Sequence, residues 1–100
     1  MEFRFEPELL SCMARRKRRC IAVEVAASNH SDIEVTELYL RLVSDDFARY
    51  LTDNKRYRRF DAPEATVLLP PYRLVCDDTV TFGLKRIWIF NRLTVQGIRL

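Results

Sequence analysis

The sequence predicts an all-β domain in which two antiparallel sheets pack face to face. Apolar residues recur at alternate positions in several short segments, and a period of two builds a strand with one buried and one solvated face. Turn residues separate these segments, as at Pro70-Pro71 and Asp77-Asp78. Such spacing is typical of a sandwich, for which we expect about seven or eight short strands and one short helix.

The composition is that of a folded globular chain. Of the 100 residues, 48% are hydrophobic and 31% are charged, which is far from the low-hydropathy composition of disordered segments. A chain of this length forms a single core. We therefore expect one domain over residues 1–100, with an N-terminal edge strand and basic segment over 1–19 and a sandwich core over 20–100.

The N-terminal segment begins with a short strand. Phe3 and Phe5 alternate with charged residues before Pro7, and proline ends a strand or lies at its edge. We expect this piece to be an edge strand. Residues 8–14 stay open between a helical turn and an irregular crossing, because a short apolar run does not reveal its period.

The clearest strand begins at Cys20, where branched apolar residues occupy every second position up to Val25. The polar cluster over residues 28–32 then predicts a turn, since short polar side chains bond their own backbone. Leucines at alternate positions predict a second strand over residues 33–43. Together the two strands make a hairpin.

The period changes after the hairpin. Ser44 can cap a helix, two aspartates suit its first turn, and apolar residues follow on one stripe, so residues 44–52 predict a short helix. A basic loop and a turn over residues 61–64 come next. The remaining predicted strands are 65–69, 72–76, 79–84, 86–90 and 93–100. Gly97 predicts a bulge inside the last of them.

A family resemblance supports this arrangement. The stretch IAVEVAASNHSDIEVTELYLRLV, followed by LLPPYRLVCDDTVTF, resembles immunoglobulin-like sandwich modules over residues 20–100. The resemblance implies a two-sheet antiparallel immunoglobulin-like sandwich. The chain departs from antibody-type domains because no tryptophan follows Cys20 at the expected interval, and Leu74 stands where the corner tyrosine belongs. A disulfide between Cys20 and Cys76 is therefore not expected.

The cysteines and the apolar runs indicate an intracellular protein, cytoplasmic, or nuclear if the source is eukaryotic or viral. Cys12, Cys20 and Cys76 are an odd number and form no C-x-x-C pair, so neither a disulfide framework nor a zinc site is predicted. Buried free thiols are expected. No run approaches the roughly 18 apolar residues of a membrane span, and no signal peptide is recognisable.

The sequence offers no convincing catalytic constellation. Its one histidine, His30, lies in a predicted turn, and adjacent Ser31 and Asp32 do not converge on it as triad members must. The pairs Asp45-Asp46 and Asp77-Asp78 are interpreted as helix capping and turn formation. Two widely spaced glycines exclude phosphate-loop fingerprints. We expect no enzyme activity, no cofactor, no metal and no small-molecule substrate.

Two basic clusters carry most of the functional content. The net charge is only +3, but the cations are concentrated in two short runs. These are Arg15, Arg16, Lys17, Arg18 and Arg19, and then Lys55, Arg56, Tyr57, Arg58 and Arg59. The first run fits nucleic-acid contact, a nuclear-import address, an acidic partner or plain solubility. In the second, aromatic residues among cations either stack on bases or anchor the loop.

A third feature is the segment Ile87 to Phe90, which is apolar on both faces. We expect it to be a buried central strand; an exposed Trp88 would instead be the leading interface anchor. The sequence as a whole predicts a non-enzymatic module that binds a protein, an acidic one or a second copy, through the basic segments and an edge strand. The alternative is a nucleic-acid binder that uses both clusters as a phosphate-contacting surface. A membrane partner is not expected.

Overall fold

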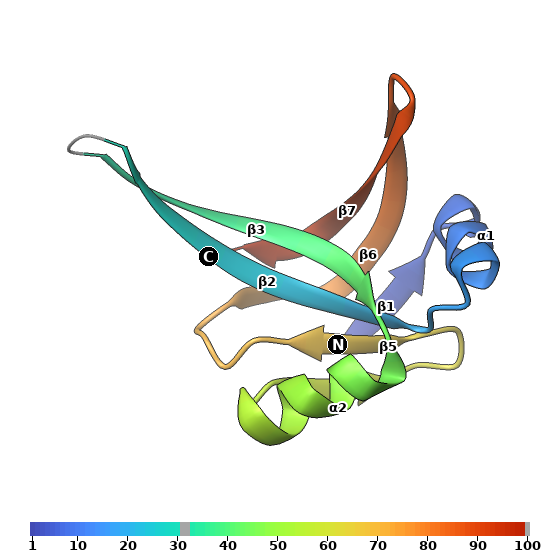
Figure 1. Ribbon diagram of the computed structural model, residues 1–100, viewed down its shortest axis with the longest axis horizontal. Coiled ribbons are helices and arrows are strands. Elements are labelled where there is room, and N and C mark those ends of the chain that lie inside the picture. Colours follow the sequence, from blue (N-terminus) through green and yellow to red (C-terminus); the bar gives the residue numbers. More distant parts are fainter. Residues whose placement is uncertain (31–32, 100) are drawn as a thin grey trace.

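The computed structural model (Figure 1) describes the backbone of residues 1–30 and 33–99 and the side chains of 1–25 and 38–99. Seven strands and two helices lie in these ranges. They are β1 (Glu2–Phe5), α1 (Pro7–Arg16), β2 (Cys20–His30), β3 (Ile33–Val43), α2 (Asp45–Asn54), β4 (Arg58–Asp61), β5 (Thr66–Leu69), β6 (Val75–Ile87) and β7 (Phe90–Arg99). The prediction of a mostly β chain is confirmed.

The strands form two mixed sheets, so the expectation of purely antiparallel sheets is wrong. One sheet has the order β1-β6-β7 and the other β3-β2-β5-β4. β1 runs parallel to β6, and β2 runs parallel to β5. The sequence pattern did not reveal this, because alternation fixes which face a residue occupies but not the direction of the neighbouring strand. β1 lies at a sheet edge, as predicted.

The hairpin of β2 and β3 is confirmed. Its ladder runs antiparallel from Cys20 opposite Val43 to His30 opposite Ile33. Of the turn predicted over 28–32, residues 28–30 continue β2, while 31–32 lie outside the described residues. The hairpin is consequently longer than predicted and forms one arm of the molecule (Figure 1).

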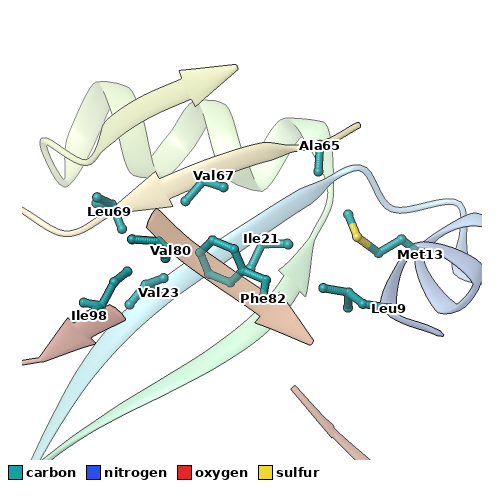
Figure 2. Close-up of a cluster of buried hydrophobic side chains, with 10 residues drawn as sticks. All are labelled: Leu9, Met13, Ile21, Val23, Ala65, Val67, Leu69, Val80, Phe82 and Ile98. Carbon is teal, nitrogen blue, oxygen red and sulfur yellow. The ribbon is translucent and has the colours of Figure 1, made fainter. Parts of the chain in front are cut away.

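The main core lies between the two sheets, with α1 packed at one end of it (Figure 2). Phe82 of β6 sits at its centre and is fully buried. Its ring packs on Phe5 at 5.7 Å and on Phe3 at 6.1 Å between centroids. The segment left open in the sequence is a helix after all, because Leu9 and Met13, four positions apart, share the face that meets the core.

α2 covers the other face of the four-stranded sheet. Ser44 accepts a hydrogen bond from the Phe47 amide at 3.1 Å, which confirms the predicted N-cap. Ala48 and Leu51 then bury themselves against Leu68 in a second, smaller cluster. Neither helix is long and apolar enough to span a membrane, as far as the described residues go.

The C-terminal hairpin differs most from the prediction. The strands expected over 72–76, 79–84 and 86–90 are one long β6 and the start of β7, joined by a two-residue turn. Asp77-Asp78 makes no turn but an irregularity, since the register shifts between Cys76 and Thr81. Gly97 lies opposite this shift with φ at +97°, in a region that favours glycine, as its predicted bulge requires.

Candidate functional site

A cleft of about 680 Å³ separates β3 from β7. In the described part of the chain each of these strands is the outermost of its own sheet, so each has one side with no neighbouring strand. The two strands touch over part of their length. Beyond that contact the long hairpins diverge in opposite directions (Figure 1), and the cleft opens between them.

Both walls of the cleft contribute apolar side chains, which alternate with polar ones such as Tyr39 and Thr94. Leu38 and Leu40 of β3 face Leu93 and Val95 of β7 across it, and all four are half-buried at the margin of the core. Ile98, which is 8% exposed, links the lining to the core itself. The alternating leucines that predicted β3 are therefore only partly buried by the core.

The charge around the cleft is positive. Arg16 reaches it from the last turn of α1, and Lys85 and Arg92 reach it from a cross-strand pair of the β6–β7 hairpin. The cleft lining contains no carboxylate among the described residues. Arg41 also borders the cleft, but its guanidinium pairs with buried Glu24 at 2.7 Å on the sheet face that α2 covers.

The hairpin between β6 and β7 ends in an exposed apolar tip, which we define as Ile87, Trp88, Ile89 and Phe90. Trp88 is 89% exposed and Ile89 82%. The expectation that this segment forms a buried central strand is wrong, because the turn falls at Trp88-Ile89 and carries the segment beyond both sheets. Trp88 is thus available as an interface anchor.

The first basic cluster follows the end of α1. Lys17 ends the helix in the left-handed region, with φ at +54°, and its amide donates back to Ala14. The positive charges of Arg15 and Arg16, in the last turn of α1, interact favourably with the negative end of the helix dipole. Arg19 donates to the Pro63 carbonyl at 3.3 Å, while all five cations are exposed.

The second basic cluster is divided between two surfaces. Arg59 lies in a pocket of about 460 Å³ with Arg19 of the first cluster and Arg49 of α2. Arg56 and Arg58 instead line a separate groove, together with Tyr72 and Arg73. Lys55 and Tyr57 border a third, beside α2. Arg19 and Arg59 are thus the residues of the two clusters that share a pocket, whereas the other residues of the second cluster line different grooves.

Carboxylates balance part of the positive charge in the pocket that Arg19 and Arg59 share. Arg59 Nε lies 3.1 Å from Asp61 Oδ1, and the Thr66 hydroxyl donates to the same oxygen at 2.8 Å. These hydrogen bonds, first that of Thr66, hold the pKa of Asp61 below its ordinary value. Asp45 also lines the pocket. Tyr57 packs against the α2 cluster rather than standing free to stack on a base.

The thiols are structural in character. Cys12 and Cys20 are buried, as predicted, whereas Cys76 is half-buried. Burial, and then a hydrogen bond to Asp45 at 3.5 Å, raise the pKa of Cys20, so its nucleophilic thiolate form is disfavoured. Within the described residues no three His, Cys, Asp or Glu side chains gather as metal ligands. The His30 side chain lies outside the described residues.

Sequence reasoning missed the cleft and the basic residue Arg73. The leucine alternation predicted that β3 buries one face but not that its outer edge stays unpaired. The tip did carry a usable signal, since Ile87 to Phe90 is flanked on both sides by cations. A buried central strand rarely has charges so close to both ends.

The chain is similar in fold to a solved structure. No protein-family model matches the sequence, and no curated protein matches it. The crystal structure of Escherichia coli SufA, involved in biosynthesis of iron-sulfur clusters, shares the fold with a TM-score of 0.56 at 11% sequence identity. The match covers 96% of this chain and 80% of that chain. This likeness overturns the immunoglobulin-like fold that the sequence resemblance implied.

Proposed function

We propose that this protein is a non-enzymatic binding module that holds an extended segment of a partner protein in the cleft between β3 and β7. The observation that carries the proposal is the position of the cleft between two edge strands. Edge strands present unpaired N–H and C=O groups to which an added strand pairs. A strand inserted there would bridge the two sheets and complete the burial of Leu38, Leu40 and Leu93.

The lining defines the chemistry of the partner segment. The apolar side chains of its lining favour apolar residues at alternate positions of the partner, because successive residues of a strand point to opposite faces. Its cations, Arg16, Lys85 and Arg92, favour acidic side chains at other positions. The proposed partner segment is therefore extended, with apolar and acidic residues in alternation.

The test uses a fluorescein-labelled peptide of alternating glutamate and valine as the probe. Fluorescence anisotropy should show binding that Arg16→Glu weakens several-fold, because the reversal places a negative charge beside the cleft. Arg15→Glu is the matched control, since Arg15 belongs to the same helical turn but does not line the cleft. Hydrogen exchange should show new protection of β3 and β7 amides.

Three results would contradict this function: no binding of the probe, equal weakening by the two variants, or protection confined to other strands. The fold neighbour adds no cluster chemistry to the proposal. Iron-sulfur clusters are held by cysteine thiolates, whereas burial and then the Asp45 carboxylate raise the pKa of Cys20, and the described residues gather no set of three potential ligands.

A nucleic-acid binder is the second candidate, and the shared pocket of Arg19, Arg49 and Arg59 favours it. Carboxylates in the same pocket oppose it. A salt series with single- and double-stranded oligonucleotides decides the matter, comparing wild type with a variant in which residues 15–19 are serine. A slope of about 0.9 log unit per phosphate contact, lost in the variant, would replace the protein-binding proposal.

A further inference from the structure

The apolar tip has features that folding does not explain. Its four side chains are exposed, from Ile87 at 40% to Trp88 at 89%. Trp88 is the only tryptophan of the chain, and it occupies the first central position of a two-residue hairpin turn with φ at +58°. Glycine, asparagine or aspartate is normal there, because a bulky side chain is strained at positive φ. A strained, exposed aromatic residue indicates a contact outside the chain.

Cations stand directly behind the tip. In the ladder, Ile87 pairs with Phe90, Arg86 with Asn91, and Lys85 with Arg92. At about 3.4 Å per residue, the three cations lie roughly 3 to 7 Å behind the last apolar pair. We call Lys85, Arg86 and Arg92 the collar. Residues 79–100 contain no aspartate or glutamate, so the part of the hairpin that carries the collar has no carboxylate, and Asp77 and Asp78 lie at its other end.

We propose that the apolar tip inserts into the interface of an anionic lipid bilayer. Apolar side chains that enter an interface reach about 5 to 10 Å below the headgroups, so the collar would lie at the depth of the lipid phosphates. Tryptophan prefers this boundary because it combines an apolar ring with a hydrogen-bond donor. The proposal goes beyond the binding of a protein in the cleft. It shares Lys85 and Arg92 with the cleft lining but depends on the exposed side chains of Trp88, Ile89 and Phe90, which lie outside it.

The shape of the tip favours a bilayer over a protein partner. A specific protein interface buries about 800 Å² on each side, contributed by some 20 to 30 residues. The tip offers four side chains around a two-residue turn, and Figure 1 shows it at the free end of the β6–β7 hairpin, away from both helices. A bilayer needs no complementary pocket and surrounds such a point on all sides.

The experiment uses the intrinsic fluorescence of Trp88. The protein is titrated with phosphatidylcholine vesicles that contain phosphatidylserine and, separately, with phosphatidylcholine vesicles alone. Emission should move to shorter wavelength with the anionic vesicles, brominated lipid should quench it, and the protein should float with these vesicles. High salt should weaken the association, because it screens exposed charges.

Variants assign the effect to the tip and the collar. Phe90→Ser keeps the Trp88 reporter and should weaken binding at least tenfold, by the loss of one inserted aromatic ring. Each collar cation replaced by serine should weaken binding about fivefold. Val75→Ser is the matched control, because Val75 is an exposed apolar residue outside the tip, and it should bind as wild type does.

Several outcomes overturn the proposal. They are no spectral shift with anionic vesicles, equal binding by the Phe90→Ser and Val75→Ser variants, or a shift without lipid that grows with protein concentration. The last would assign the tip to contact with a second copy. Because Arg16→Glu leaves the tip and collar intact, failure of the cleft proposal and failure of the membrane proposal give different results.

Discussion

The two sides of the β2–β3 hairpin are built from similar residues and reach different degrees of closure. On the side of α2, Cys20 and Ala22 of β2 are almost wholly buried, together with Leu68 of the neighbouring β5. On the side of the cleft, Leu38 and Leu40 are only half-buried. The difference arises because the capped helix α2 covers one face of the sheet, whereas no element of the described chain covers the cleft between β3 and β7. The apolar surface exposed beside the cleft therefore results from the arrangement of the strands and not from the residue types of the hairpin.

The largest test of this contrast replaces the centre of the closed core. Phe82→Ala should lower the free energy of unfolding by about 3 to 5 kcal/mol, because it leaves a cavity where three phenylalanine rings meet. Leu38→Ala, in the cleft, should cost no more than about 1 kcal/mol. Urea denaturation followed by circular dichroism measures both. Similar costs would mean that the cleft is closed in solution.

The closed face depends on the cap of α2. Ser44→Ala should destabilise the protein by about 1 kcal/mol, because the Phe47 amide loses its side-chain acceptor. Ser44→Asp is the control, since aspartate accepts the same bond and should retain most of the stability. A loss shared equally by both variants would show that the hydroxyl itself, and not capping, is what matters.

At the exposed apolar tip a substitution should raise the free energy of unfolding, whereas the substitutions above lower it. Trp88→Gly should stabilise the protein by about 1 kcal/mol, because glycine adopts the positive φ of the turn without strain. The same variant should lose its affinity for anionic vesicles, measured by flotation. Greater stability with weaker binding is the expected signature of a residue retained for function. A destabilised variant would remove the argument from strain.

The smallest expected effect is a dependence of the protein's stability on pH through Asp61. The folded-state pKa of Asp61 lies below its ordinary value of 3.8, owing first to the Thr66 hydroxyl and then to Arg59. The ionised carboxylate therefore contributes stability above about pH 3.8, and this contribution is lost as pH falls through the folded-state pKa. Asp61→Asn should lower the melting temperature near neutral pH but not in strong acid. A difference that is constant with pH would contradict the assignment.

Local features of the fold were predictable from the sequence and long-range pairings were not. The hairpin from Cys20 and the helix after Ser44 follow from alternation and capping, which act between near neighbours. The parallel pairings of β1 with β6 and of β2 with β5 leave no mark in either strand alone. A count of seven or eight strands fits both the immunoglobulin-like fold and the observed one, so the resemblance misled.

The candidate site was predictable in its residues rather than in its arrangement. The basic runs and Trp88 stand out in the sequence, and the cations of both runs and Trp88 are exposed, whereas Tyr57 is half-buried. Their grouping depends on the tertiary fold. Arg16 lines the cleft, Arg19 shares a pocket with Arg59, and Arg56 shares a groove with Arg73. Trp88 was expected to be buried because the segment Ile87 to Phe90 is apolar on both faces, and nothing in that pattern revealed the turn at Trp88-Ile89.

The pairing of β1 with β6 also sets the order in which the molecule can form. Glu2 to Phe5 find their partners only at Thr79 to Phe82, so β1 has no partner strand until residues 79–82 have left the ribosome. Contacts of such sequence separation place folding in the range of about milliseconds to seconds. Until then Phe3 and Phe5 lack their core, and a chaperone that meets this part of the nascent chain meets an unpaired strand.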